Sequence, residues 1–318
     1  MAVHTILLKK EIVQFLKDYD IGNLKSFEGI KQGIENTNYL IKTTKKKYIL
    51  TIFEKRIKQS ELPFYLELMD FSNKNNINCP ISIKNSFQKN LVSLKSKKCA
   101  LFTFIEGKCL ENWSDKICYK IGQILGDFHN VNKKFKKKNK NHFDLKGWQK
   151  LFKKCASGIN KLIPNTKDEI YNELIYLSDN WPQKLPKGII HADFFPDNIL
   201  FKNSEVTGIL DFYFSCYDFF IYDIAIAINA WCFKSNKIQL SRIKQLLSGY
   251  KSKRKISIHE MQALNICLRG ASMRFLLTRI HDSLFVKKNF LYTLKNPKEY
   301  YDKLIFHTLN IRNKEYFD

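Results

Sequence analysis

The strongest constraint on the fold is a stretch in which short apolar strands end on acidic or amide side chains. One apolar run leads into a loop that carries Asp193 and Asn198, and a later run ends on Asp211. Short apolar runs bounded by polar turns predict buried strands, which would deliver these side chains to one place. A carboxylate buried beside aromatic rings is costly unless a cation or a hydrogen-bond partner compensates it. Oxygen ligands of this kind suit Mg²⁺, so the three residues predict a magnesium site.

The spacing of these residues indicates a class of reaction. Kinases use an Asp that takes the proton of the acceptor, an Asn five residues later, and a following strand that ends in a second Asp. In that arrangement the Asn and the second Asp hold metal on the phosphates. The alternative is that these are ordinary loop residues, because Asp and Asn favour turns. Two such segments in the right order and separation favour the kinase interpretation.

The amino-terminal part of the chain predicts an antiparallel meander. Three short β-rich runs, at 26–30, 38–41 and 47–53, are separated by polar turns. The first turn contains Gly33 and Asn36, whose backbone N–H groups could lie over nucleotide phosphates. A single Gly in a hairpin is more often only a turn. The position of this turn upstream of the acidic loops is what favours a phosphate contact.

A later apolar run, 99–105, ends on Glu106 and is either a plain sheet strand or the connection between two lobes, where backbone groups would pair with an adenine edge. The sequence beyond it predicts helices. In the predicted helix 116–129, Gly122 and Gly126 recur four residues apart and permit close helix packing. We interpret His129, at the end of this helix, as a structural residue outside the site.

The composition indicates a packed globular protein without a nucleic-acid partner. The chain has 318 residues, of which 44% are hydrophobic, and this is enough for two lobes. Its net charge of +24 suggests nucleic acid or a membrane surface. However, Lys, Asn and Ile are abundant along the whole chain, and no RNA-binding signature or zinc-finger spacing is present. The basic run Lys133–Lys140 is interpreted as a solvated loop, with weak anion binding as the alternative.

Cysteine usage and hydropathy favour a cytoplasmic location. The eight cysteines are scattered without a Cys-x-x-Cys pair, which is typical of reduced thiols and disfavours a zinc site. Residues 1–19 show no secretory signal, and no apolar run reaches the roughly 20 residues of a membrane span. We therefore expect no membrane partner; the oligomeric state is left open by the sequence.

The acidic segments resemble a known family. The loop His191-Ala-Asp-Phe-Phe-Pro-Asp-Asn198 resembles the His-Gly/Ala-Asp-x-x-x-x-Asn loop of the aminoglycoside phosphotransferase-like kinases. The later segments Ile209-Leu-Asp211 and Tyr222-Asp-Ile-Ala225 resemble their metal-binding strand and the helix start that follows it. The resemblance implies an α+β, protein-kinase-like two-lobed fold, with residues 1–105 as a small antiparallel β lobe and 106–318 as a larger helical lobe.

The same resemblance implies ATP and Mg²⁺ as cofactors and assigns roles to the acidic segments. Asp193 becomes the catalytic base, and His191 supports its loop through hydrogen bonds. Asn198 and Asp211 become the metal ligands. Asp223 braces the catalytic loop rather than taking part in the chemistry.

The third strand departs from the pattern of this family, whose members present a Lys there to the α- and β-phosphates. The matching face carries Thr51 and Phe53 before Lys55. Lys55 lies on the same face by the period of two, so we take it as the predicted cation. Lys47, Arg56, or metal and backbone alone are the alternatives. The predicted nucleotide contacts are Gly33, Asn36, Lys55 and Glu106.

A wider resemblance, spread over nearly the whole chain, indicates the acceptor. Eight segments are similar to the homoserine kinases of the aminoglycoside-phosphotransferase type: 19–22, 33–39, 50–56, 62–69, 190–198, 211–216, 229–233 and 269–279. The resemblance implies ATP-dependent phosphorylation of the side-chain hydroxyl of L-homoserine, a step towards threonine.

An amino-acid acceptor requires a cation for its carboxylate and an acid or carbonyl for its ammonium group. Arg274 and Arg279, in an otherwise apolar helix, are the candidates for the carboxylate. Five residues apart on an α-helix, they point about 140° away from one another, so one faces the site and the other is structural. Tyr213, Asn229 and Trp231 could wall the site, although an aromatic-rich core explains each of them as well.

Two other classes of function stay open at this point. The first is a kinase for another small alcohol, such as choline, methylthioribose or an aminoglycoside. A polycationic aminoglycoside requires an acidic basin, which 54 Lys and Arg against 30 Asp and Glu do not suggest. The second is a pseudokinase or a basic RNA-binding protein. The net charge and the missing strand Lys favour it, and the complete Asp-Asn-Asp set opposes it.

Overall fold

The computed structural model describes five stretches of the chain: residues 4–30, 36–54, 57–286, 294–309 and 314–317. The chain divides into two compact units. Among the described residues, the first unit consists of the chain up to Gly107 together with Thr207–Tyr213, and the second contains the remainder.

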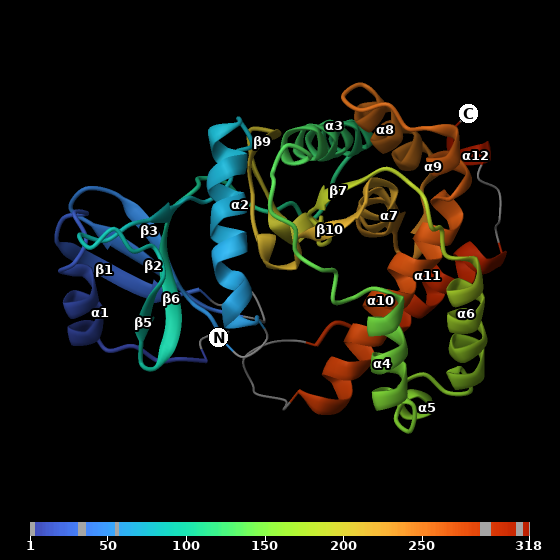
Figure 1. Ribbon diagram of the computed structural model, residues 1–318, viewed down its shortest axis with the longest axis horizontal. Coiled ribbons are helices and arrows are strands. Elements are labelled where there is room, and N and C mark those ends of the chain that lie inside the picture. Colours follow the sequence, from blue (N-terminus) through green and yellow to red (C-terminus); the bar gives the residue numbers. More distant parts are fainter. Residues whose placement is uncertain (1–3, 31–35, 55–56, 287–293, 310–313, 318) are drawn as a thin grey trace. The chain divides into compact units, whose positions relative to one another are not determined.

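The first unit is built on an antiparallel sheet (Figure 1). Its strands in spatial order are β1 (Leu24–Gly29), β2 (Thr37–Thr43), β3 (Lys47–Ile52), β6 (Lys97–Thr103) and β4 (Ser82–Ile83), with β5 (Val92–Leu94) also paired to β6. Its helices are α1 (Lys9–Leu16) and α2 (Leu62–Lys74), with a 3₁₀ turn at Gln59–Glu61. The first three strands pair in sequence order, which confirms the predicted meander.

One face of this sheet carries the core of the first unit. Strands β2 and β3 alternate buried with more exposed side chains, so Ile41 and Leu50 point to the same face. Helix α1 lays Ile12 and Leu16 on that face, where all four join one apolar cluster. Complete burial of an aliphatic side chain is worth about 1.5–3 kcal/mol, so this cluster stabilises the unit.

The second unit is mainly helical. Its helices are α3 (Asp115–Asn132), α4 (Leu145–Cys155), α5 (Ile159–Leu162), α6 (Lys167–Asn180), α7 (Phe220–Trp231), α8 (Leu240–Lys251), α9 (Ile258–Gln262), α10 (Leu264–Phe285), α11 (Lys298–Leu309) and α12 (Lys314–Phe317). The short strand pairs of the remaining chain are β7 (Lys187–Ile190) with β10 (Cys216–Phe219), β8 (Ile199–Lys202) with β9 (Glu205–Ile209), and β11 (Phe233–Lys234) with β12 (Lys237–Ile238). The first and the third of these pairs are antiparallel. The predicted α+β class, with an antiparallel amino-terminal sheet and a helical remainder, is confirmed.

Helices α7 and α10 pack against each other in the interior of the second unit (Figure 1). Nearly every residue of α7 is buried, as expected for a helix that is apolar on all sides. A polar side chain on such a helix needs a hydrogen-bond partner inside the protein. No helix in the described ranges is both long enough and apolar enough to cross a membrane.

Helices α3 and α8 run side by side and approach closely at small residues (Figure 1). A Cβ atom added to Gly122 would lie 1.9 Å from the carbonyl oxygen of Leu246, and one added to Gly249 would lie 2.0 Å from the carbonyl oxygen of Tyr119. Each helix therefore places a glycine against the backbone of the other. The predicted close packing at Gly122 is confirmed.

We expect Gly122→Ala to lower the free energy of unfolding by about 1–3 kcal/mol or more, because the methyl group has no space beside a backbone carbonyl. Urea denaturation measures this loss. Gly126→Ala is the milder comparison, because its added Cβ would lie 2.8 Å from the Lys253 Cβ and 3.2 Å from the Tyr250 carbonyl oxygen, a smaller overlap than at Gly122. This variant should therefore lose less stability. Equal stability of both variants and the wild type would contradict the close approach.

Candidate active site

The loop between β7 and β8 holds Asp193 and Asn198 together. The side-chain amide nitrogen of Asn198 donates to the main-chain carbonyl of Asp193 and to its Oδ2, in both cases at 2.8 Å. A short 3₁₀ turn, Pro196–Asn198, brings the Asn back to the Asp. These two bonds fix the Asp193 carboxylate and also determine which way the Asn198 amide points.

His191 supports this loop from inside the protein. Its side chain is buried, and its ring packs edge-on against Phe128 and Phe194. The main-chain N–H of Asp193 donates to His191 Nδ1 at 3.3 Å. Because Nδ1 accepts this bond, this nitrogen carries no proton. The position fits the predicted supporting role.

Ala192 has a left-handed backbone conformation, with φ of 62°. This region is unfavourable for a residue with a Cβ, so neighbouring groups must hold the loop in place. Asp223, in the first turn of α7, accepts the N–H groups of His191 and Ala192, both at 2.8 Å. Arg274 on α10 donates to the Ala192 carbonyl. The loop is therefore clamped on both sides of the strained residue, and the predicted bracing by Asp223 is confirmed.

The charge of Asp223 is stabilised although the residue is fully buried. Burial alone favours the neutral acid, but the hydrogen bonds from His129 and from the N–H groups of the loop outweigh it, so the net effect lowers the pKa of Asp223. His129 Nε2 lies 3.0 Å from Asp223 Oδ2. His129 is thus behind the catalytic loop, and our sequence interpretation left it out. The sequence does contain a signal for this role: His129 lies on the apolar face of the 116–129 helix, and a buried polar ring needs a hydrogen-bond partner.

Burial raises the pKa of Asp193, while the positive charge of Arg274 acts in the opposite direction. A carboxyl group with a raised pKa is a better proton acceptor near neutral pH than an ordinary one. Its Oδ1 accepts no hydrogen bond from the described part of the chain, whereas Oδ2 is bonded to Asn198. Oδ1 is therefore the oxygen that can receive a proton from an acceptor hydroxyl.

Asp211 and Tyr213 belong to the first unit. Asp211 follows the end of β9 and has a φ of 57°, a conformation that Asp tolerates better than most residues. Tyr213 packs edge-on against the rings of Phe53 and Tyr65, at centroid distances of 5.3 and 5.8 Å. Burial raises the pKa of Tyr213 well beyond its usual value, so its hydroxyl stays protonated.

The donor set fits Mg²⁺. With its amide nitrogen committed to Asp193, Asn198 turns its Oδ1 the other way, and this oxygen accepts no hydrogen bond from any residue that the structure describes. A carbonyl oxygen of this kind, together with the Asp211 carboxylate, belongs to the ligand class that Mg²⁺ prefers.

Two of the predicted substrate contacts lie inside the helical unit. Trp231, fully buried at the end of α7, donates its indole N–H to the Phe194 carbonyl at 2.8 Å. Asn229 is also fully buried, and its amide donates to the Leu268 carbonyl and to Ser272 Oγ, both at 3.0 Å. Trp231 therefore holds the catalytic loop, and Asn229 joins α7 to α10. These contacts do not favour a place in the wall of a substrate site.

The two candidate arginines of α10, Arg274 and Arg279, contact different segments, as their spacing of five residues predicts. Arg274 bonds the Ala192 carbonyl and is surrounded by aromatic rings, of which that of Phe275 lies 4.7 Å from the guanidinium carbon. Arg279 pairs with Glu299 at 2.7 Å. Arg274 is thus the one beside the catalytic loop, and Arg279 joins α10 to α11.

The predicted nucleotide contacts divide into two groups. Gly33 and Lys55 lie outside the described residues. Asn36 is buried, and its Oδ1 accepts the main-chain N–H of Glu54 at 3.4 Å. Glu106 is exposed and pairs with Lys47 at 2.8 Å. Lys47, the first residue of β3, is therefore paired with a carboxylate.

An ion pair that the sequence did not predict follows the end of β3. Lys97 on β6 pairs with Glu54, whose carboxylate also accepts the hydroxyl groups of Thr5 and Thr37. Burial opposes the charge of Glu54, but these bonds and the Lys97 charge together lower its pKa. Because these residues lie far apart in the sequence, no local pattern predicts that they pair.

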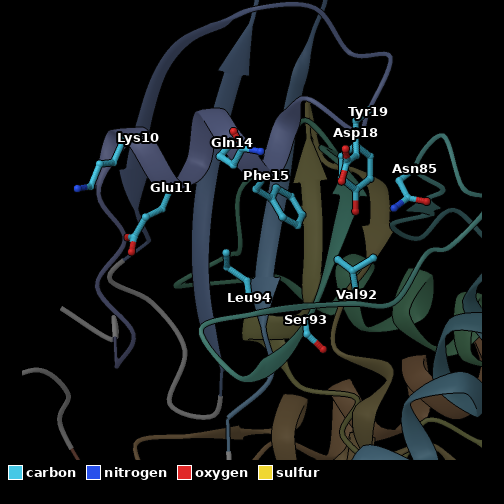
Figure 2. Close-up of a pocket in the computed structure, with 10 residues that line it drawn as sticks. All are labelled: Lys10, Glu11, Gln14, Phe15, Asp18, Tyr19, Asn85, Val92, Ser93 and Leu94. Carbon is cyan, nitrogen blue, oxygen red and sulfur yellow. The ribbon is translucent and has the colours of Figure 1, made fainter.

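A cavity of about 480 Å³ in the first unit lies apart from these residues (Figure 2). It opens beside α1 and β5, with Phe15, Val92 and Leu94 among its lining residues. Helix α1 is only eight residues long and covers part of the sheet, so these side chains stay partly exposed. As far as the structure describes the chain, the lining contains none of the predicted site residues, and we assign the cavity no role in the chemistry.

Comparison with known proteins gives the relationship of the chain. Residues 26–255 match the model of a family described as a phosphotransferase enzyme family. The chain is 38% identical over 317 residues to a homoserine kinase of Rhizobium meliloti (strain 1021), covering 99% of this chain and 97% of that protein. It is 39% identical over 317 residues to a homoserine kinase of Rhizobium rhizogenes (strain K84 / ATCC BAA-868), covering 99% of each.

Solved structures agree at the level of the fold. A spectinomycin phosphotransferase in complex with ADP and spectinomycin matches with a TM-score of 0.75 at 15% identity, covering 97% of this chain and all (100%) of that one. The choline kinase LicA from Streptococcus pneumoniae matches with a TM-score of 0.67 at 17% identity, covering 95% and 99%. These matches confirm the predicted resemblance to the aminoglycoside phosphotransferase-like kinases and their protein-kinase-like fold. The chain therefore belongs to the phosphotransferase enzyme family.

Proposed function

We propose that the protein transfers the γ-phosphoryl group of ATP to the side-chain hydroxyl of L-homoserine, which gives O-phospho-L-homoserine and ADP. The observation that carries this proposal is similarity to proteins named homoserine kinase along almost the entire length of both chains. The geometry of the catalytic loop supports the reaction class, because Asn198 holds Asp193 with one carboxylate oxygen left for an acceptor hydroxyl.

Asp193 is the catalytic base in this mechanism. The hydroxyl oxygen of homoserine attacks the γ-phosphorus, the bond from that phosphorus to the leaving ADP oxygen breaks, and Asp193 Oδ1 takes the hydroxyl proton. Asn198 keeps Oδ2 occupied and so directs Oδ1 towards the acceptor. Asp223 and Arg274 hold the strained backbone at Ala192 and keep the base in position.

Asn198 Oδ1 and Asp211 would hold Mg²⁺, which neutralises charge on the phosphates when it is bound. We further propose that Gly33, Asn36, Lys55 and Glu106 contact the nucleotide. Arg274 is the cation that we favour near the acceptor carboxylate, because its charge acts on Asp193. A cytoplasmic location remains a prediction that is consistent with eight free cysteines, seven of them buried.

The acceptor is tested by measuring ADP release with L-homoserine, choline and kanamycin, and by identifying the phosphorylated product by mass spectrometry. Of these three acceptors, we expect only homoserine to be phosphorylated. L-2-Aminobutyrate is the matched control because it has the same carbon skeleton without the hydroxyl; it should inhibit competitively and give no product. Faster turnover with choline or kanamycin would identify a different kinase. Absence of turnover with every acceptor would indicate a pseudokinase.

A further inference from the structure

A row of buried polar side chains behind the catalytic loop has no part in the chemistry described above. Asp223, which accepts the loop N–H groups, contacts His129 at 3.0 Å. The other ring nitrogen of His129, Nδ1, lies 2.7 Å from the hydroxyl of Tyr250. Arg254 Nη1 lies 3.2 Å from the same hydroxyl. His129, Tyr250 and Asp223 are all completely buried, so the contacts among these three residues are shielded from water.

The hydrogen bonds in this row must all run in one direction. The Asp223 carboxylate can only accept, so His129 Nε2 carries the proton and donates to it. His129 Nδ1 then has a lone pair and accepts the hydroxyl proton of Tyr250. The Tyr250 oxygen in turn accepts from Arg254, which can only donate. Donation therefore passes from Arg254 through Tyr250 and His129 to Asp223.

The protonation states required by this direction agree with the surroundings. Burial lowers the pKa of His129 and outweighs Asp223, which acts to raise it; the charge of Arg254 lowers it further, and that of Glu260 raises it. The ring is therefore neutral near neutral pH. Burial raises the pKa of Tyr250, so its hydroxyl keeps the proton that it donates.

Arg254 is itself held in a fixed position. Its Nη2 pairs with Glu260 at 2.9 Å, and Glu260 is buried at the start of α9, where it caps the helix together with Ser257. The guanidinium carbon lies 4.4 Å from the centre of the Phe220 ring. The charge of Glu260 and the Phe220 ring together hold the Arg254 guanidinium beside the Tyr250 hydroxyl.

The row depends on the close approach of α3 and α8. His129 lies on α3 and Tyr250 on α8, and the two helices touch where Gly122 and Gly249 meet the opposite backbone. Larger residues at these glycines would move the His129 ring away from the Tyr250 hydroxyl. The packing of two helices is thereby linked to the conformation of the catalytic loop.

We propose that Tyr250 and Arg254 are positioning residues for phosphoryl transfer: through the hydrogen bond to Nδ1 they fix the orientation of the His129 ring, which orients Asp223 and hence the backbone that carries Asp193. This proposal rests on the proposed function, since the reaction being positioned is the phosphorylation of homoserine. None of these side chains needs to touch substrate. They act by keeping the loop in the strained conformation at Ala192.

Tyr250→Phe tests the row with little change of volume. Without the hydroxyl, His129 Nδ1 is buried with no donor, so the ring keeps its proton on Nε2 but loses the contact that fixes its orientation against Asp223. Because a small misplacement of a catalytic group is costly and one hydrogen bond is lost, we expect kcat to fall about tenfold. The KM values for ATP and homoserine should stay within about twofold, because a positioning role alters the reacting geometry more than binding.

Tyr19→Phe is the matched control. Tyr19 is a buried tyrosine of the first unit, and its hydroxyl has no hydrogen-bond partner in the described part of the chain. The same atom is removed, so a general effect of losing a buried hydroxyl would appear in both variants. We expect wild-type kcat for Tyr19→Phe. A Tyr250→Phe variant with wild-type kcat would overturn the proposal.

A spectroscopic measurement tests the row without any acceptor. In ¹⁵N-histidine-labelled wild-type protein, with signals assigned by comparison with His129→Gln, His129 should appear as the neutral Nε2–H tautomer near neutral pH. In Tyr250→Phe the ring should keep the Nε2–H tautomer, and the Nδ1 signal should move to higher frequency because this nitrogen no longer accepts a hydrogen bond. A charged ring, or the Nδ1–H tautomer in the wild type, would overturn the proposal. Failure of the proposed function is seen separately, as wild-type protein that does not phosphorylate homoserine.

Discussion

Replacement of Asp193 by Asn should lower kcat for homoserine phosphorylation by about 10²- to 10⁴-fold, the range that a general base contributes. The amide has no lone pair basic enough to take the hydroxyl proton, and Oδ1 of Asp193 is the oxygen that the loop leaves for this purpose. Stopped or quenched assays of ADP formation measure the loss.

The same substitution should leave the fold intact. Burial raises the pKa of Asp193, which means that the folded protein disfavours its charged form. A neutral amide of equal size therefore costs no stability at neutral pH and can increase it. Thermal unfolding should show a midpoint at or above that of the wild type. Loss of turnover in a folded protein separates the chemical role of Asp193 from a structural one.

Asp197→Asn is the control for this prediction, because it makes the same change four residues along the same loop. The Asp197 side chain is exposed and pairs with Lys295 at 2.8 Å. An exposed ion pair is worth about 0–1 kcal/mol, so kcat should change by no more than a few-fold. If Asp193→Asn kept kcat as well as this control does, Asp193 could not be the base.

Asp193 and Asn198, which were predicted from local spacing, are in contact in the structure. Asp193 and Asn198 are joined by a short turn, so their contact is determined within six residues. The bracing role of Asp223 comes from the family resemblance, which rests on a local motif at the start of an apolar helix. The meander of the first unit was predictable for the same reason, since alternation of apolar residues is a local property.

The partners of polar residues in buried helices could not be predicted. Asn229 and Arg274 lie on helices that are buried on most faces, so the apolar period does not show which face meets a cavity and which meets another helix. In the structure Asn229 donates to the Leu268 carbonyl and Arg274 donates to the Ala192 carbonyl. In each case the donor and the acceptor lie far apart in the sequence. A polar residue in an apolar helix is thus equally compatible with a substrate contact and with a structural bond.

Contacts across long stretches of sequence were also missed. Tyr213 packs on Phe53 and Tyr65, and Asn78 donates to the Thr207 carbonyl, which places a later segment in the first unit. Composition and periodicity describe each segment alone. They do not show which distant segments share a core, so such a grouping is found only in the folded chain.

Asp223→Asn should lower both stability and turnover. The carboxylate accepts N–H groups from His191, Ala192 and His129, and an amide turns an NH₂ group towards at least one of these donors. Removing the charged member of a buried network costs about 3–5 kcal/mol of unfolding free energy. Loosening of the strained loop should also lower kcat about 10²-fold, because a misplaced base reacts poorly.

The stability loss should depend on pH with a defined sign. The folded protein lowers the pKa of Asp223, so its contribution to stability is present above the unfolded pKa of about 3.9 and disappears as the pH falls through the lower folded value. Urea unfolding at a series of pH values should therefore show the largest difference between wild type and Asp223→Asn at neutral pH. The difference should shrink in acid.

Asp218→Asn supplies a control with the opposite slope. Asp218 accepts the amide of Asn141 at 2.7 Å, but burial raises its pKa above the ordinary value. Ionised Asp218 therefore lowers the stability of the folded wild type as the pH rises from the unfolded to the folded pKa, and the variant should gain relative to wild type over that window. Equal slopes for the two variants would mean that the charge of Asp223 is not held by the loop and by His129, and the bracing of Asp193 would need another source.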